Sequence, residues 1–310
     1  MKIGVIGAGA VGSASVFALI MRGRARHIVV LDRNHARAKA VATDMRYGAP
    51  LSGRVEVAAG DYGDLAGCGL VMITAGVNEK SGGATDRSDP AGRLRLLDTN
   101  AGVFRDIVPQ IVAVAPEAVI LVVTDPPDPL AELARKLAGH GRVLSTGTYL
   151  DSLRLRVHIG AALGVDPAAV EAQILGEHGT SEVFVWSGVR IAGVPLAAML
   201  AERGIAPEAF RPGIEREVRY ANIAIIDGNN ASQYGIGMVS ARLAEMVLRD
   251  ERAAIPIGVH DERYGTTLSV PAIVGRSGAG EILVAPLDPE EQKALEQSAE
   301  ALRQAVARIR

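Results

Sequence analysis

Short apolar runs alternate with longer helical patterns through the first half of the chain, and no other feature constrains the fold as strongly. Six runs have the length and apolar character of buried strands, at residues 3–6, 27–31, 55–58, 70–74, 119–123 and 143–145. Helical patterns lie between them, at residues 10–21, 35–45, 91–114 and 128–138. Strands separated by helices indicate right-handed crossovers between parallel strands. The sequence therefore predicts an α/β fold with a doubly wound parallel sheet of six strands, covered by helices on both faces.

The second half of the chain has a different pattern. Two long helical stretches and three apolar strands are predicted, at residues 207–227, 236–249, 255–259, 268–274 and 281–284. A last helix begins at Asp288, where the sequence Asp-Pro-Glu-Glu has the form of a capping box with proline at the first helical position. Because chains of 310 residues usually divide into two domains, we expect a first domain at residues 1–146 and a separate α+β domain at residues 147–310.

Composition and charge exclude several classes of partner. Lys and Arg total 33 against 35 for Asp and Glu, so the net charge of −2 offers no field that would attract nucleic acid or an anionic membrane surface. The apolar runs are far shorter than the roughly 20 residues that cross a bilayer, and the N-terminus lacks the pattern of a signal peptide. We therefore expect a cytoplasmic protein with a small-molecule partner. The single cysteine, Cys68, is expected in the core, and no metal site is predicted.

A glycine-rich turn follows the first predicted strand. It reads Gly7-Ala8-Gly9-Ala10-Val11-Gly12 and opens the first predicted helix, which is the context in which G-x-G-x-x-G indicates a dinucleotide site in a Rossmann fold. Gly7 permits the tight turn, Gly9 lets a pyrophosphate approach the backbone, and Gly12 lets the helix lie close to the strand. Ala10 and Val11 lie at the helix N-terminus, which faces the phosphates. We expect all five residues to bind the cofactor.

An acidic residue, Asp32, ends the second predicted strand, 20 residues beyond Gly12. A carboxylate at this position accepts hydrogen bonds from the adenosine ribose and repels a 2′-phosphate, so the pattern favours NAD over NADP. The alternative is a plain glycine turn, with Asp32 acting only as the cap of the next helix.

Four further segments complete a pattern that extends along the chain. They are residues 60–62 (GDY), 70–76 (LVMITAG), 147–154 (GTYLDSLR) and 175–179 (LGEHG). Together with the glycine turn, they resemble the L-lactate and malate dehydrogenase family over essentially the whole length. The resemblance implies an NAD-dependent enzyme that interconverts a small L-2-hydroxy acid and its 2-oxo acid, and a homodimer or homotetramer. It also implies that the cofactor contacts Thr74, Ala75, Gly76, Asn100 and Ile236.

The resemblance assigns the catalytic roles to three residues in the segments at 147–154 and 175–179. Asp151 and Arg154 are three residues apart at a helix start and so share a face. Arg154 is expected to bind the substrate carboxylate, and Asp151 to orient the imidazole of His178. Reduction of a 2-oxo acid needs a proton at the carbonyl oxygen, and a neighbouring carboxylate favours the imidazolium that supplies it. A lone histidine between glycines is usually structural, but these companions favour catalysis.

The resemblance also implies an arginine on a loop that closes over the substrate, polarises its carbonyl and excludes water. Arg93 fits the family's register, Arg87 and Arg95 are the rivals, and a merely solvated arginine is the plain alternative. The irregular segment at residues 81–92 is longer than in ordinary lactate or malate dehydrogenases. It is similar to that of L-2-hydroxyisocaproate dehydrogenases, which favours a larger or less selective pocket.

Two acidic residues depart from the family's pattern. Glu79 falls at the specificity position, where it would repel the second carboxylate of oxaloacetate, so malate is disfavoured unless Lys80 or Arg87 turns inward. Asp125 stands where the family has an Asn that donates a hydrogen bond. Together they suggest a substrate with a cationic side chain, with local loop and turn chemistry as the alternative. Ser232 aligns with a pocket-lining position.

Three other functions stay open on the sequence alone. One is malate dehydrogenase, which the acidic specificity position disfavours. Another is an NAD-dependent glycosidase of similar fold, which would need a metal held by Cys and His, although Cys68 is far from His178 in the order of motifs. The third is a non-catalytic NAD-binding protein of the same fold, which Asp125 makes conceivable.

Overall fold

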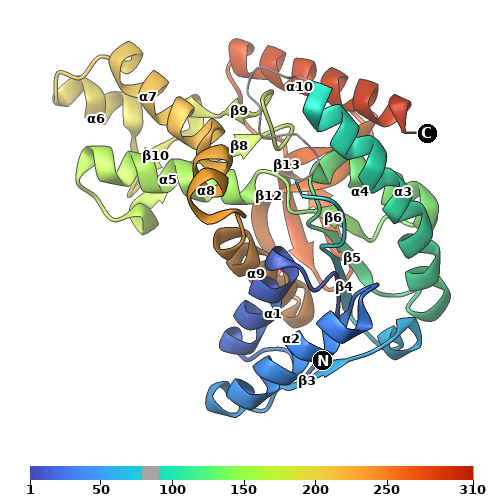
Figure 1. The fold of residues 1–310 in the computed structure, drawn as a ribbon. Helices are drawn as coiled ribbons and strands as arrows, with labels where there is room; N and C mark the ends of the chain where they lie inside the picture. Colours follow the sequence, from blue (N-terminus) through green and yellow to red (C-terminus); the bar gives the residue numbers. More distant parts are fainter. Residues whose placement is uncertain (79–90, 310) are drawn as a thin grey trace.

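The computed structural model describes residues 1–78 and 91–309 (Figure 1). The first half alternates strands and helices: β1 (Lys2–Ile6), α1 (Ala10–Arg22), β2 (His27–Leu31), α2 (His35–Gly48), β3 (Glu56–Ala59), β4 (Leu70–Ile73), α3 (Ala91–Val114), β5 (Val119–Val122), α4 (Pro127–Ala138) and β6 (Val143–Ser145). Every element predicted for this half is present, and the ends differ from those predicted by at most three residues. Two short 3₁₀ turns flank β3, η1 (Ala49–Ser52) and η2 (Tyr62–Leu65).

The six strands of the first half form a parallel sheet in the order β3-β2-β1-β4-β5-β6. Ile6 pairs with Leu31 on one side and with Ile73 on the other, so the central strands end level with one another. Strand order reverses between β1 and β4, which is where open parallel sheets bind ligands beyond their carboxyl ends. The predicted doubly wound sheet is confirmed.

The second half contains α5 (Tyr149–Leu163), η3 (Pro167–Ala169), β7 (Val170–Glu171), β8 (Ile174–Leu175), β9 (Val183–Phe184), η4 (Trp186–Gly188), β10 (Arg190–Ile191), β11 (Val194–Pro195), α6 (Leu196–Glu202), α7 (Pro207–Arg219), α8 (Ala221–Asn229), α9 (Tyr234–Arg249), β12 (Ala253–Asp261), β13 (Thr266–Gly275), β14 (Gly278–Ile282) and α10 (Pro289–Arg308). The single helix predicted at residues 207–227 is therefore wrong. Tyr220, with φ of −107° and ψ of 7°, interrupts it. No proline or glycine adjoins Tyr220, so the apolar pattern alone gives no sign of the break.

The three long strands of the second half extend the sheet of the first. Antiparallel β12, β13 and β14 follow one another, and β12 pairs with β6 through Gly258 and Ser145, which gives nine strands in one sheet. A Cβ at Gly258 would lie 1.7 Å from Ser145 Oγ, so this close approach requires glycine. The strand predicted at residues 281–284 begins earlier, because Gly275 and Gly278 form the tight connection from β13. The second half thus shares a sheet with the first, although the sequence predicts a separate domain. The domain boundary after residue 146 stays a prediction.

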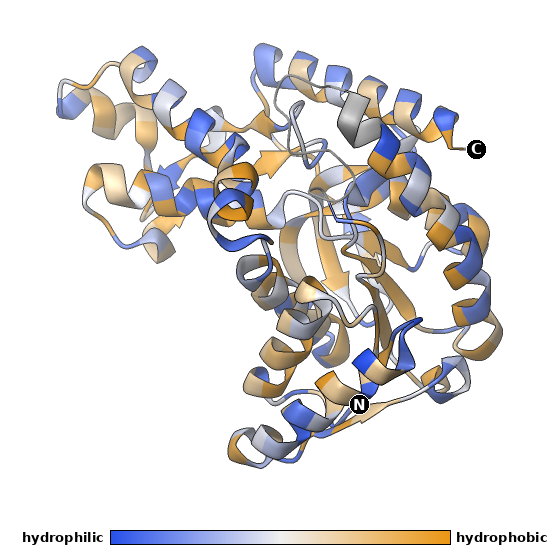
Figure 2. Cartoon of the chain, in the orientation of Figure 1, coloured by the Kyte–Doolittle hydropathy of each residue, from blue (hydrophilic) through white to orange (hydrophobic). Residues whose placement is uncertain are grey.

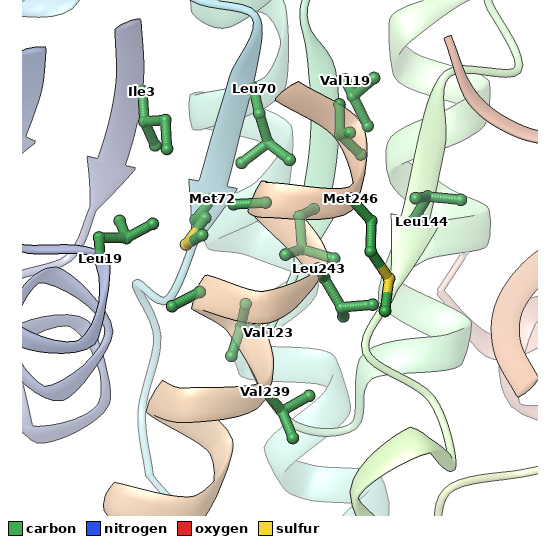
Figure 3. Packing of buried hydrophobic residues seen from close by; sticks show 14 of the residues in the cluster. Ile3, Leu19, Leu70, Met72, Val119, Val123, Leu144, Val239, Leu243 and Met246 are labelled. Carbon is green, nitrogen blue, oxygen red and sulfur yellow. The ribbon is translucent and has the colours of Figure 1, made fainter. Parts of the chain in front are cut away.

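Helices cover both faces of the sheet with apolar side chains. On one face, Leu243 and Met246 of α9 pack against residues that include Met72 of β4, beside α1 (Figure 3). On the other face, Phe104 of α3 belongs to a second cluster with residues of α4, and Cys68 is buried there as expected. A third cluster, which includes Trp186, lies among α5, α6 and α7. Figure 2 shows apolar residues concentrated on the enclosed strands and polar residues on the outer sides of the helices.

The last helix, α10, begins with the predicted capping box. The Asp288 carboxylate accepts the backbone N–H of Glu291 at 2.8 Å, and the Glu291 carboxylate accepts the N–H of Asp288 at 3.1 Å. Leu295 and Leu302 bury the inner face of the helix. Neither this helix nor any other in residues 1–78 and 91–309 is long and apolar enough to cross a membrane.

Candidate active site

A cavity of about 530 Å³ opens at the carboxyl ends of β1, β4, β5 and β6. The loops after these strands line one side, and α5, α8, α9 and the loop between β8 and β9 line the other. Ten residues predicted from the sequence line it: Gly9, Ala10, Val11, Thr74, Gly76, Asp125, Arg154, His178, Ser232 and Ile236. Predicted site residues from both halves of the chain therefore meet at one cavity.

The glycine turn after β1 forms one end of the cavity. Gly7 has a φ of 110°, and a Cβ at Gly12 would lie 1.8 Å from the carbonyl oxygen of Gly7, so the turn itself requires both glycines. A Cβ at Gly9, in contrast, would meet nothing within 4 Å. Gly9 is the N-cap of α1. The open space above it is what the approach of a phosphate group to a helix N-terminus requires.

Asp32 is fixed against this turn directly after β2. Its Oδ2 accepts the N–H of Ala8 at 2.7 Å, and its Oδ1 accepts the N–H of Asn34 at 2.8 Å. The N-cap of α2 is Asn34, whose side chain accepts the N–H of Arg37. Asp32 is therefore not simply a helix cap, and its half-buried carboxylate is held where it can accept further hydrogen bonds from a ribose.

The segment after β4 packs on the glycine turn. Thr74 Oγ1 donates to the carbonyl oxygen of Gly7 at 2.9 Å, and a Cβ at Gly76 would lie 2.7 Å from Asn100 Oδ1. Asn100 is fully buried and donates to the carbonyl oxygen of Asp125 at 2.8 Å. The sequence assigned Asn100 to cofactor contact. In the structure it lies behind the loops that follow β4 and β5 and holds them together, and its contact with a cofactor stays a prediction.

His178, Asp151 and Arg154 form a connected group at the other end of the cavity. His178 Nδ1 lies 2.5 Å from Asp151 Oδ2, and Arg154 Nη1 donates to Asp151 Oδ1 at 2.7 Å. Asp151 and Arg154 reach one another because they are one turn apart at the start of α5. His178 and Arg154 line the cavity, whereas Asp151 is buried behind them. With Nδ1 turned to Asp151, His178 Nε2 is on the opposite side of the ring, 4.0 Å from Asp125 Oδ1.

The charge state of Asp151 is set by these two partners. Burial alone would raise the pKa of Asp151, but the attraction and hydrogen bond of His178, together with those of Arg154, lower it. The carboxylate therefore stays ionised and favours a protonated imidazole.

Asp128 supports His178 from a position that the sequence did not single out. Its Oδ2 accepts the backbone N–H of His178 at 2.8 Å, and its Oδ1 accepts the Ser145 hydroxyl at 2.5 Å. Burial raises the pKa of Asp128 to about 6, although both hydrogen bonds act in the opposite direction. Asp128 fastens the His178 loop to α4 and β6. In the sequence, only its position three residues after Asp125 could have indicated that Asp128 belongs to the site.

Asp125 faces the reactive side of the imidazole. Its Oδ1 lies 4.0 Å from His178 Nε2, at the end of the loop after β5. A carboxylate at this place can accept hydrogen bonds but cannot donate one. Because Glu79 lies outside the described residues, the cationic side-chain hypothesis stays a prediction.

The wall opposite the sheet comes from α8, α9 and the turn between them. Ser232 and Ile236 line it as the sequence indicated, and so do Asn222 and Asn230, which the sequence reasoning missed. The break at Tyr220 starts the helix that carries Asn222. Nothing in the pattern of the helix predicted at residues 207–227 distinguished Asn222, and Asn230 follows that helix, two residues before Ser232.

Part of the predicted site lies outside the described residues. Glu79, Lys80 and Arg87 fall in residues 79–90, and the side chain of Arg93, in the first turn of α3, is likewise outside the description. Arg95 has an exposed side chain on α3. Within residues 1–78 and 91–309, no group of three or more His, Cys, Asp or Glu side chains could hold a metal ion.

Comparisons with known proteins cover the whole chain. Residues 1–143 match the family model described as lactate/malate dehydrogenase, NAD binding domain, and residues 148–310 match the lactate/malate dehydrogenase, alpha/beta C-terminal domain. The L-lactate dehydrogenase of Chloroherpeton thalassium is 42% identical over 312 residues, with 100% of each chain covered. That of Deinococcus radiodurans is 42% identical over 304 residues, covering 98% of this chain and 97% of its own. The crystal structure of minor L-lactate dehydrogenase from Enterococcus mundtii in the ligands-bound form superposes with a TM-score of 0.92 at 32% identity, covering 100% and 98%.

Proposed function

Because the chain belongs to the lactate/malate dehydrogenase family and is an NAD-dependent oxidoreductase acting on 2-hydroxy acids, we propose that it interconverts a monocarboxylic L-2-hydroxy acid and its 2-oxo acid with His178 as acid and base. The observation that carries this proposal is the Arg154–Asp151–His178 group at one end of a cavity whose other end is the glycine turn. An anion-binding guanidinium and a proton donor thus face the same space.

The residues at the glycine turn fit the cofactor. The open backbone at Gly9 suits the pyrophosphate, and Asp32 suits the adenosine ribose. When bound, NADH supplies the hydride. The protein holds the two ends of the cavity at a fixed distance from one another. On the side of the sheet, hydrogen bonds from Thr74 and Asn100 join the loops that form these ends.

At the other end, Arg154 binds the substrate carboxylate and so orients the carbonyl group. His178 donates a proton from Nε2 to the carbonyl oxygen during reduction and takes it back during oxidation. Asp151 stabilises the imidazolium form and fixes the ring. By the family resemblance, Arg93 closes over the substrate and polarises its carbonyl.

The substrate class follows from the charges around this end of the cavity. A second carboxylate, as in oxaloacetate, needs a second cation to compensate its burial. Among the described lining residues the guanidinium groups are those of Arg154 and Arg37, and Arg37 lies at the Asp32 end on α2. Asp125 adds a negative charge near His178. These positions support a monocarboxylic substrate, and the long segment at residues 81–92 supports tolerance of bulkier side chains.

A panel of 2-oxo acids tests the proposal through the rate of NADH oxidation. We expect turnover of pyruvate, 2-oxo-4-methylpentanoate or phenylpyruvate to exceed that of oxaloacetate by about tenfold or more in kcat/KM, since an uncompensated carboxylate near other negative charge costs at least about 1.4 kcal/mol. An amino-bearing 2-oxo acid tests the cationic alternative. A preference for oxaloacetate would show that the chain is a malate dehydrogenase, and no turnover of any oxo acid would refute the proposal.

Replacing Asp32 by Asn is expected to weaken the preference for NADH over NADPH by about 10- to 100-fold, because the charge that repels the 2′-phosphate is removed while one acceptor for the Ala8 N–H remains. The measurement is kcat/KM for each cofactor at one saturating 2-oxo acid. Asn34→Ala serves as a control, since it removes the cap of α2 but leaves the Asp32 carboxylate. An unchanged ratio in Asp32→Asn would contradict the role of Asp32.

A further inference from the structure

A buried carboxyl group that has no part in the reaction described above lies beside the His178 site. Glu182 precedes β9, four residues after His178, and its side chain is 3% exposed. Among the described residues, its Oε1 has no hydrogen-bond partner. Buried polar atoms are almost always hydrogen-bonded. A carboxyl oxygen buried without a hydrogen bond, four residues from a proton donor, calls for a functional explanation.

The cation that faces Glu182 compensates it only in part. Arg219 Nε of α7 lies 3.6 Å from Glu182 Oε1, and this N–H also has no hydrogen-bond partner in the described part of the chain. The guanidinium donates instead to the backbone carbonyl oxygen of Glu182 at 3.5 Å and lies 5.2 Å from the centre of the Phe184 ring. The guanidinium would therefore attract an ionised Glu182, but without the hydrogen bond that would fix the carboxylate in that form.

Several charged groups act on this carboxyl or on its neighbour His178. They are Asp151 and Arg154 on α5, Arg219 on α7, His178 on the loop between β8 and β9, and, facing His178, Asp125 and Asp128. Burial, followed by repulsion from Asp151, raises the pKa of Glu182 to about 8 against the attraction of His178 and the two arginines. Glu182 therefore becomes negatively charged at a higher pH than an exposed carboxyl group does.

We propose that Glu182 is a positioning residue for the proton: the negative charge that its buried carboxyl gains on ionisation keeps His178, four residues away in the same loop, protonated as the pH rises. The sign follows from electrostatics, because a negative charge near an imidazole favours the imidazolium. Glu182 is not among the residues that line the cavity, so it acts through its neighbours and not on the substrate. The proposal rests on the proposed role of His178 as the acid.

The test compares Glu182→Gln with the wild type. Gln keeps the shape but cannot gain the charge, so the alkaline limb of the pH profile of kcat/KM for 2-oxo acid reduction is expected to move to lower pH by at least about 0.5 unit. The alkaline limb should also approach the slope expected for the loss of a single proton, because Glu182, one of the two interacting groups, no longer titrates. Glu182→Asp, which keeps a carboxyl group, should preserve the wild-type limb. Glu208→Gln, the same change at an exposed position on α7, is the matched control.

A second readout does not depend on turnover. The His178 imidazole can be titrated by NMR in histidine-labelled protein, its signal among the six histidines being identified by its loss in His178→Gln. In Glu182→Gln its midpoint should move in the same direction as the kinetic limb. Glu182→Met is the second neutral variant if Gln does not fold. A uniform loss of activity with both titrations unmoved would make Glu182 structural and overturn the inference. Full turnover by His178→Gln would instead refute the proposed function.

Discussion

Replacement of Arg154 by glutamine is expected to lower kcat/KM for 2-oxo acid reduction by about 100- to 1000-fold, or about 3–4 kcal/mol. Arg154 lines the cavity with only 14% of its side chain exposed, and one of its nitrogens already binds Asp151. Its remaining donors can therefore hold a carboxylate in a poorly solvated place, where the loss of one partner of a charge pair is costly. Steady-state kinetics with the substrate chosen by the oxo acid panel provide the measurement.

Two comparisons show whether this loss reflects carboxylate binding. Arg154→Lys keeps the positive charge but not the planar pair of donors, so its activity should fall between those of the wild type and Arg154→Gln. With the neutral amide of the same 2-oxo acid, the wild type and Arg154→Gln should differ little. NADH affinity, measured by fluorescence titration, should be retained in both variants. Equal losses with the acid and the amide would mean that Arg154 only supports Asp151.

The parallel sheet and the glycine turn could be predicted because their causes are local. Each buried strand of the first half is a continuous apolar run, as in Leu70–Ile73, and Gly7 and Gly12 are required by the turn itself. The pairing of Asp151 with Arg154 is local as well, since three residues separate them on one helix. For His178 the sequence offered only the family resemblance, because its contact with Asp151 joins residues 27 apart.

Features that depend on distant contacts could not be predicted. The approach of β12 to β6 depends on Gly258 meeting Ser145, more than 100 residues away. In the sequence, Asp128 is simply a residue in the first turn of a predicted helix. Its hydrogen bond with the backbone of His178 can be seen only in the folded structure. Glu182 gave no signal for the same reason, because its neighbours Asp151 and Arg219 come from other elements.

The residues behind the cavity explain why the site should be sensitive to changes that touch no ligand. Asp128 holds the backbone of His178, and Asn100 holds the backbone of Asp125. Both carry buried polar groups whose partners lie in other segments of the chain, so removal of either would leave an unsatisfied group and let a loop shift. The first half thus does more than bind the cofactor, since Asp128 belongs to α4 and positions a residue of the second half.

Replacement of His178 by glutamine is expected to lower kcat by about 10²- to 10⁴-fold, the usual contribution of a positioned proton donor, while NADH binding survives. The reason is spatial: His178, held by Asp151, and Gly9, in the turn that Asp32 supports, come from different parts of the cavity wall. Kinetics and a fluorescence titration of NADH measure the two properties separately. Asp151→Asn is the informative companion, because it removes the charge that favours the imidazolium yet keeps the side chain's shape, and it should lose activity and shift the pH profile to lower pH. Loss of NADH binding together with turnover in His178→Gln would mean that the imidazole holds the loop in place and that the proton comes from elsewhere.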